Sequence, residues 1–246
     1  LPVSLPGALT LDITLEFEAV TDLTLVNAGL SAAVVSPLDA GLVGRLPDSV
    51  ISIPAEFPVL VLVEPPGVGL TTLAFDGIYT LTLLTPNLPY YPGTRLRMFT
   101  AHDGGDFEDI TRETSKGSYR VRGSGGEFSE FLIALDTRHP EAIVDAKLTV
   151  LQALLTGYSG AIDATVFASL QSLLDSADTL WQKRNVNTAI AELDNFTAAI
   201  VAATSVEIPD SWAATGGPDN IAGILRGKAA TLRFSMVETI THTRDQ

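Results

Sequence analysis

Apolar and polar residues alternate along the first part of the chain, up to about Arg138. Between Leu9 and Glu18 every odd-numbered position is apolar, and every even-numbered position is Thr, Asp or Glu. Successive side chains of a β-strand point to opposite faces, so this segment is predicted to be a strand with one solvated face.

Further short apolar runs follow, separated by turns rich in Pro and Gly. We expect strands at residues 23–26, 30–35, 50–53, 59–63, 77–84, 94–101, 107–111, 118–122 and 128–135. Turns are expected at residues 36–37, 65–67, 86–87, 91–93, 103–105 and 123–126, the last as a flexible hairpin. Many short strands at this spacing are typical of an Ig-like antiparallel β-sandwich.

After His139 and Pro140 the apolar residues recur at steps of three and four. This spacing predicts an amphipathic helix that buries Val144, Leu148, Leu151 and Leu155 and ends at Gly157. Three further helices are expected, with Asp163, Asn187 and Asp219 near their starts. The chain is therefore expected to be α+β in two parts: a β-sandwich domain over residues 1–138 and a three- to four-helix bundle over residues 139–246.

Residues Phe107 to Leu135 carry a resemblance to known modules. An Asp-Ile-Thr strand is followed by a Gly-rich segment and by Phe-Ser-Glu-Phe-Leu-Ile-Ala-Leu. The run resembles the end of β-sandwich modules of bacterial secreted and cell-surface proteins. That resemblance implies a non-catalytic protein located outside the cell.

A second resemblance covers residues 172–202. Leu173, Leu174, Ala177 and Leu180 are followed by a polar turn with Asn185, and then by Ala189, Ile190, Leu193 and Phe196. This pattern is similar to the small helical modules that follow sandwich domains in large bacterial surface proteins. The resemblance implies spacers and assembly surfaces.

Charge narrows the classes of partner. The chain has 29 acidic and 15 basic residues, a formal net charge of −14. Binding phosphate backbones requires clustered Lys and Arg, so nucleic acid is not an expected partner. Apolar runs such as residues 57–63 are much shorter than the roughly 20 residues of a membrane helix, so no membrane-spanning segment is expected.

The chain contains no Cys, which excludes disulfides, thiolate metal sites and Cys nucleophiles. It opens with Leu-Pro-Val-Ser-Leu-Pro, which suits a mature product whose signal peptide has been removed. Together with the resemblances, this predicts an extracellular or cell-surface location.

Four acidic residues, Asp103, Asp106, Glu108 and Asp109, lie close together beside two glycines. Closely spaced carboxylate oxygens can hold Ca²⁺. The spacing is not that of an EF-hand, and strand alternation would send Asp109 to the face opposite Asp106 and Glu108. A weak calcium site and a solvated acidic turn both remain open, and no other cofactor is expected.

Signals for catalysis are sparse. The histidines at positions 102, 139 and 242 do not have a metalloenzyme spacing. His102 beside Asp103 is a candidate base, with Ser129 or Ser118 as nucleophile, but no nucleophile elbow or oxyanion pocket accompanies them. We therefore expect a protein that is not an enzyme.

Two functional hypotheses remain. The leading one is a structural protein, a self-assembling subunit of a bacterial surface layer or filament. Its first strand would add to the open sheet edge of a neighbouring copy, because an unpaired edge is a template for another strand. The residues expected at this contact are Leu1, Val3, Leu5, Leu9, Leu11 and Ile13. The partners are then other copies of the chain or other surface proteins.

The alternative is an adhesin or carbohydrate-binding module. Tyr90, Tyr91 and Trp212 lie in segments expected to be loops, where aromatic rings can stack on a sugar. With Asp106, these residues would contact a glycan, with or without Ca²⁺. Packing of the same rings against the end of the sandwich is the competing interpretation.

Overall fold

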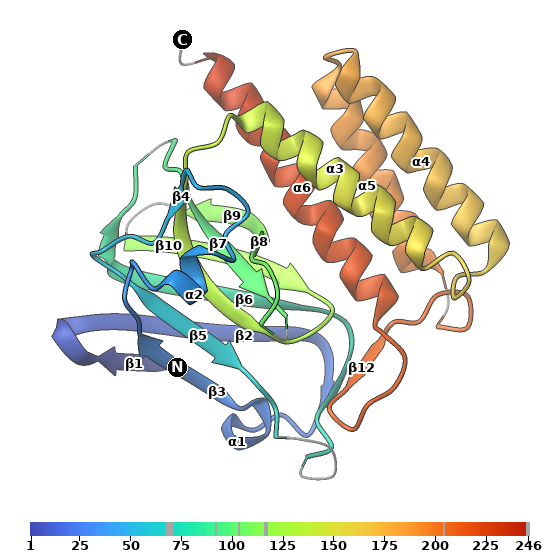
Figure 1. The fold of residues 1–246 in the computed structure, drawn as a ribbon. Helices are drawn as coiled ribbons and strands as arrows, with labels where there is room; N and C mark the ends of the chain where they lie inside the picture. Colours follow the sequence, from blue (N-terminus) through green and yellow to red (C-terminus); the bar gives the residue numbers. More distant parts are fainter. Residues whose placement is uncertain (67–70, 92, 103, 116–117, 204, 245–246) are drawn as a thin grey trace.

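The protein is α+β, with two antiparallel sheets and a helical C-terminal part (Figure 1). The computed structural model describes residues 1–66, 71–91, 93–102, 104–115, 118–203 and 205–244. The alternating and helical patterns of the sequence therefore predicted the two kinds of secondary structure in their correct order.

Sheet A has the strand order β1-β2-β6-β10-β9, and β12 pairs with β6. Its strands are β1 (Pro2–Leu5), β2 (Leu9–Thr21), β6 (Ala74–Pro89), β9 (Thr111–Ser115), β10 (Ser118–Gly125) and β12 (Ser211–Ala213). The alternation seen in the sequence places Leu11 and Ile13 of β2 in the core and Asp12 and Thr14 in solvent.

Sheet B has the strand order β3-β5-β11-β7-β8, and β4 pairs with β11. Its strands are β3 (Leu30–Val34), β4 (Ile51–Ser52), β5 (Val59–Val63), β7 (Leu96–Ala101), β8 (Glu108–Asp109) and β11 (Glu130–Asp136). Two four-residue helices flank β3: α1 (Leu25–Ala28) lies between β2 of sheet A and β3, and α2 (Ala40–Val43) lies between β3 and β4.

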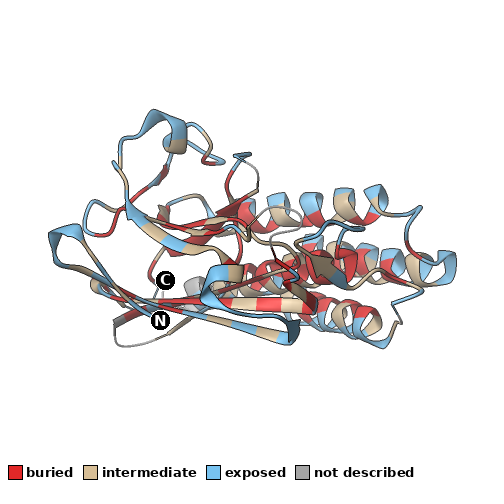
Figure 2. Cartoon of the chain, turned by 90° about the horizontal axis from the view of Figure 1, so that it is seen from below, coloured by how far each residue is buried: buried red, intermediate tan, exposed pale blue. Residues whose placement is uncertain are grey.

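The two sheets share one buried apolar cluster. Sheet A contributes Leu11, Leu81 and Val121, and sheet B contributes Val61 and Phe131, among others. A smaller cluster that includes Phe99, Phe107 and Leu132 also draws on sheet B. Figure 2 shows buried residues concentrated where strands and helices pack together, while the hairpin of β1 and β2 is largely exposed or half-buried.

Four longer helices follow: α3 (Pro140–Gly157), α4 (Ala164–Gln182), α5 (Val186–Ala202) and α6 (Ile221–Arg244). All four contribute to a single buried cluster that includes Leu151, Leu174, Phe196 and Leu225. Helix α4 begins beside Asp163, as predicted, and the Asp163 carboxylate caps it by accepting hydrogen bonds from the Thr165 and Val166 amides. None of the helices in the described part of the chain is both long enough and apolar enough to cross a bilayer.

Helix α6 lies against sheet A on one side and against α3 and α5 on the other (Figure 1). Glycines allow this close approach. A Cβ on Gly126 would lie 2.5 Å from the Ile224 nitrogen, and a Cβ on Gly227 would lie 2.8 Å from the Ser124 carbonyl oxygen. The Asn220 side chain fastens the start of α6 to the sheet, since its Nδ2 donates to the Gly77 carbonyl at 2.7 Å.

Several local predictions were wrong. Residues 23–26 were expected to be a strand, but Thr24 caps the short helix α1 by accepting from the Asn27 amide, and the helix stops at Gly29 with φ 59°. The expected turn at residues 86–87 lies inside β6, opposite an irregularity in the register of β10. Helix α5 begins after Asn185, so Asn187 is within it.

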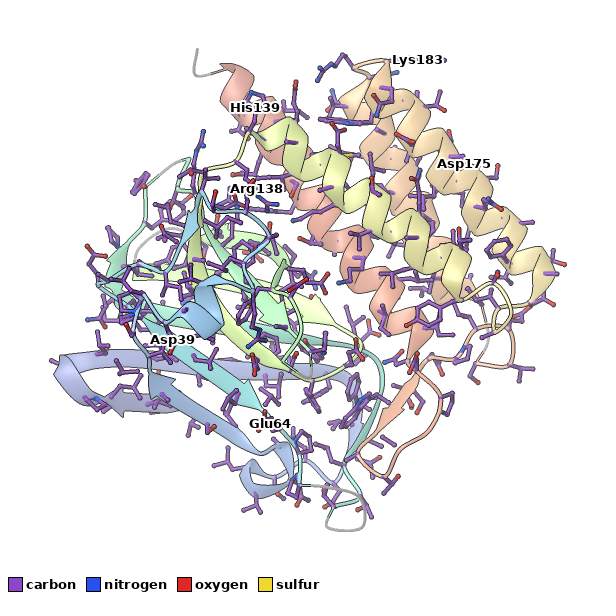
Figure 3. All side chains as sticks on the ribbon, in the orientation of Figure 1. Asp39, Glu64, Arg138, His139, Asp175 and Lys183 are labelled. Carbon is purple, nitrogen blue, oxygen red and sulfur yellow. The ribbon has the colours of Figure 1, made fainter. Side chains whose placement is uncertain are left out.

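The segment 123–126, expected to be a flexible hairpin, is instead largely part of β10 and is packed against α6. Figure 3 labels Arg138 and His139, where the chain leaves sheet B and enters α3. The division into domains at this point stays a prediction; β12, from beyond it, pairs with β6 of sheet A.

Candidate functional site

The six residues expected at an assembly contact lie together in one hairpin. β1 pairs with β2 in antiparallel register, which places Val3 opposite Leu11 and Leu5 opposite Leu9. Leu1 and Ile13 exchange two backbone hydrogen bonds, of 2.6 and 2.9 Å. The side chains of Val3, Leu5 and Leu9 pack against the cluster between the sheets. The first strand thus completes sheet A of its own chain.

The turn that joins β1 to β2 is short and exposed. It consists of Pro6, Gly7 and Ala8, all solvent-exposed, and no atom lies within 4 Å of where a Cβ on Gly7 would stand. Gly7 has φ 78° and Ala8 has φ 59°. A left-handed backbone is unfavourable for alanine because its Cβ crowds the carbonyl, so Ala8 carries local strain.

The described acidic residues of the predicted calcium site, Asp106, Glu108 and Asp109, are not gathered around one point. Asp103 lies outside the described residues, and Asp106 is exposed. Glu108 pairs with Lys228 of α6, and Asp109 pairs with Lys147 of α3. Within the described ranges, no group of three or more acidic or His side chains is placed to hold a metal ion. Two of the four expected calcium ligands therefore serve as ion-pair partners for helical lysines.

Lys147 lies at the centre of a buried polar cluster between β8, α3 and α6. Its Nζ donates to Asp109 Oδ2 at 2.6 Å, to Thr231 Oγ1 at 2.6 Å and to Ser235 Oγ at 2.9 Å. The Asp109 side chain is 1% exposed, and that of Lys147 is 12% exposed. Asp109 Oδ1 accepts from the Thr111 amide at 2.8 Å. The three donors of the ammonium group and both carboxylate oxygens are thus satisfied.

Burial alone would raise the pKa of Asp109, since a low dielectric disfavours its charge. The positive charges of Lys147 and Arg97, with hydrogen bonds from Lys147 and Thr111, outweigh that effect and lower its pKa below 3.8. The carboxylate therefore stays ionised and keeps Lys147 bound. Burial also lowers the pKa of Lys147, an effect that the charge and hydrogen bond of Asp109 oppose. All three protons of the ammonium group are donated to neighbouring oxygens.

Sequence reasoning missed this cluster, although one signal was available. Lys147 lies one residue before Leu148 and three after Val144, on the apolar face of the helix that the spacing predicted. A lysine in such a position is rarely buried unless it is paired. Its partners come from β8 and from α6, and no pattern in the sequence indicates that these two elements lie beside Lys147.

The three aromatic residues of the glycan hypothesis lie at opposite ends of strand β6. Trp212 pairs with Phe75 near the start of β6 and stacks on that ring at 5.4 Å between centroids. Tyr90 and Tyr91 follow the other end of the same 16-residue strand. Tyr90 packs against the cluster between the sheets, and Tyr91 is exposed. One strand length therefore separates the tyrosines from the tryptophan.

The candidate base and nucleophile face other groups. His102 Nδ1 lies 3.1 Å from the Phe128 carbonyl oxygen, and its Nε2 lies 3.4 Å from Glu127 Oε1. The Ser129 hydroxyl donates to the Ala101 carbonyl and is buried. The side chain of Ser118, and that of His242, lie outside the described part of the structure. His139 is exposed before α3, where it lies 4.0 Å from Glu141.

An open cavity of about 240 Å³ lies where sheet A meets α5 and α6. Its polar lining includes Glu18, Asp76, Asp210 and Arg226, and Ile200 and Ile208 are among its apolar residues. Arg226 holds Glu18 through two hydrogen bonds, of 2.7 and 2.6 Å. Chiefly through the hydrogen bond from Arg226, the pKa of Glu18 is lowered. This arrangement fastens α6 to β2.

Comparison with curated proteins finds no match to this chain. A family model described as "Family of unknown function (DUF6689)" matches residues 1–239, which include both sheets and most of α6. The chain belongs to this family, DUF6689.

Proposed function

We propose that the protein is a non-catalytic, extracellular structural protein that assembles with copies of itself by exchanging its first strand. In the exchanged form, β1 of one copy pairs with β2 of the next. Leu1, Val3 and Leu5 then meet Ile13, Leu11 and Leu9 of the neighbouring copy in the register that a single chain uses now. The product is a chain or ring of copies, as expected for a surface layer or filament subunit.

One observation carries the proposal: a four-residue edge strand is joined to its sheet by a strained, exposed turn. β1 pairs only with β2 among the described strands, so the residues from Leu1 to Leu5 account for its whole ladder. Exchange conserves that ladder between copies, so its enthalpic cost is small. Extending the turn also releases the left-handed backbone of Ala8, and short strained hinges favour such swapping.

The architecture in this proposal is an Ig-like β-sandwich followed by a helical bundle. The cluster of buried residues shared by the two sheets supports the first part, and the separate cluster shared by α3 to α6 supports the second. The resemblance of the sequence segments 107–135 and 172–202 to modules of large surface proteins agrees with this proposal.

A non-catalytic role is supported by the way the buried charges are used. Lys147 and Asp109 satisfy each other and two hydroxyl groups, and Glu18 is held by Arg226. Catalytic groups are typically left available to a substrate, whereas these join helices to strands.

A disulfide trap tests the exchange. Ser4 and Thr10 are both exposed and stand directly opposite each other in β1 and β2. They form a pair without mutual backbone hydrogen bonds, because Leu1 with Ile13 sets the hydrogen-bonded positions; such pairs have the shorter Cα separation that a disulfide needs. The chain has no Cys of its own, so Ser4→Cys with Thr10→Cys introduces the only disulfide.

After assembly and oxidation, we expect covalent dimers and higher species on a non-reducing denaturing gel. The two single-Cys variants are the controls, since they report accidental cross-links at each position. A double variant that runs only as an oxidised monomer would show that β1 stays in its own chain and would refute the exchange. Labelling of intact cells with an antibody to the chain tests its location; labelling only after lysis would contradict an extracellular role.

A further inference from the structure

The strands that end the two sheets differ in how well they are protected from further pairing. In β1, Leu1 and Val3 direct their backbone groups at β2, so Pro2 and Ser4 direct theirs outward. Proline has no N–H, and the next outward position is Pro6. The outer edge of β1 therefore offers a single donor, at Ser4, and proline is a common means of blocking an edge.

The opposite edges are protected by charge and by helices. β9 carries Arg112 and Glu113, both exposed, and α6 contacts it. β8 has only two residues, and both of its carboxylates are paired with lysines of α3 and α6. Short strands, charged side chains and covering helices all discourage pairing with another chain.

β3, at the edge of sheet B, has none of these protections. Val35 donates to Pro58 and Glu64 donates to Gly29, which fixes residues 29, 31, 33 and 35 as the positions bonded to β5. The amides and carbonyls of Leu30, Ala32 and Val34 therefore point away from the sheet. No hydrogen bond from elsewhere in the described chain reaches them. The strand reads Leu-Ser-Ala-Ala-Val, without Pro, Lys or any charge.

The surroundings of β3 are apolar at both ends. Residues 23–38 contain no charged side chain, although the chain as a whole has a net charge of −14. Leu25 and Val26 precede the strand with 61% and 76% of their surface exposed, and Leu38 follows it with 86% exposed. Asp39 and Glu64, labelled in Figure 3, lie beyond the two ends of the strand. Two copies can approach along this edge with little repulsion.

We infer that β3 pairs with β3 of a second copy, antiparallel and across a two-fold axis at Ala32. Leu30 then meets Val34 of the second copy, and Ala32 meets its own equivalent. An antiparallel copy brings the start of one strand to the end of the other, so Leu25 and Val26 approach the partner's Leu38. This self-complementarity favours a second copy as the occupant, and pairing buries apolar groups that are otherwise exposed.

The pairing rests on the proposed self-assembly but uses a different sheet from the strand exchange, so the two can fail separately. Sedimentation velocity of the full chain over a range of concentrations measures it. Val34→Pro removes one outward N–H, and the two-fold axis makes that two lost hydrogen bonds per dimer. We expect at least about tenfold weaker association. Ser4→Pro is the matched control, because it removes the one outward N–H of β1.

Loss of association in Val34→Pro, with association retained in Ser4→Pro, is the expected result. Unchanged association in both variants would overturn the pairing, and so would a wild-type chain that sediments as a monomer at every concentration. If Val34→Pro does not fold, Val34→Lys with Leu38→Glu places charge on the same edge and keeps the backbone intact. If the Ser4→Cys/Thr10→Cys disulfides are interchain but Val34→Pro associates as strongly as the wild type, only the pairing is refuted. If the disulfides are intrachain but Val34→Pro no longer associates, only the exchange is refuted.

Discussion

The edge strands on the two sides of the paired sheets differ in how they are covered. On the β8 and β9 side, α6 covers β9, and ion pairs from α3 and α6 join helix to strand. On the β1 and β3 side, four- and five-residue strands end the sheets without a covering helix in the described residues, and apolar side chains are exposed nearby. On the covered side, the polar groups form ion pairs and hydrogen bonds within the chain. The open side leaves backbone groups available to another chain.

This contrast separates stability from assembly. In a buried, fully bonded cluster every donor and acceptor is already used within the chain. Removing one side chain is costly because its partner is left buried without a hydrogen bond. A strand edge contributes little to the fold of its own chain but can pair with any compatible strand. Substitutions on the covered side should therefore unfold the protein, whereas those on the open side should change its state of association.

The largest effect is expected from Lys147→Met. The change leaves the Asp109 carboxylate buried without its cation, and breaking a buried pair in this way typically costs 3–5 kcal/mol. We expect the free energy of unfolding to fall by about 4 kcal/mol. Urea denaturation followed by circular dichroism measures it, and a loss below about 1 kcal/mol would contradict the role given to the cluster.

Adding Asp109→Leu to Lys147→Met is the matched control. With both charges gone, much of the lost stability should return, because an apolar pair often replaces a buried ion pair well. The lowered pKa of Asp109 also predicts how stability depends on pH. The ionised carboxylate contributes to the free energy of unfolding in full above pH 3.8, and this contribution is lost as the pH falls through the lowered pKa. The double variant should lack that part of the acid response.

A smaller loss is expected from Gly126→Ala, which tests the contact of α6 with sheet A. The new Cβ would stand 2.5 Å from the Ile224 nitrogen, and neither backbone can move away cheaply. Overpacking of this kind typically costs 1–3 kcal/mol, and we expect about 3 kcal/mol in the same denaturation experiment. Gly157→Ala is the control, since nothing lies within 4 Å of its Cβ position; an equal loss there would refute the steric argument.

The smallest effect is expected on the open side, from Ala8→Gly. Glycine adopts φ 59° without strain, so the closed turn should gain about 0.5–1 kcal/mol. The disulfide trap should then give a smaller interchain fraction than it does with Ala8. Gly7→Ala is the opposing variant: it adds strain at φ 78° and should raise that fraction. If both variants leave the fraction unchanged, the turn does not control exchange.

The sequence predicted what depends on neighbouring residues. The alternation around Leu11 and Ile13 predicted β2, and the spacing of Leu148, Leu151 and Leu155 predicted α3. Both patterns report which face is buried. The cap at Asp163 was predictable because a side chain two residues away satisfies the first free amides of its own helix.

What the sequence could not predict depends on residues far apart. The glycines at 123–126 indicated flexibility, but Gly126 lies against the start of α6, about 100 residues later in the chain. No local pattern distinguishes a loose glycine from one that is packed against a helix. Helix α1 has only four residues, too few to show a helical period. The six residues predicted for an assembly contact lie in one hairpin, and their role stays a prediction. The pairing of Leu1 with Ile13 within one chain follows from the left-handed turn at Gly7 and Ala8.

The glycine contact between α6 and β10 also restricts how this protein can evolve. The backbones of α6 and β10 touch directly at these glycines, and a Cβ would not fit there. Neither the strands nor the last helix can therefore be replaced by the equivalent element of another protein unless that element also lacks side chains at the contact. Recombination that cuts between residues 138 and 221 would separate surfaces shaped for each other. Both halves should therefore be inherited as a unit, which agrees with a family model that runs through residue 239.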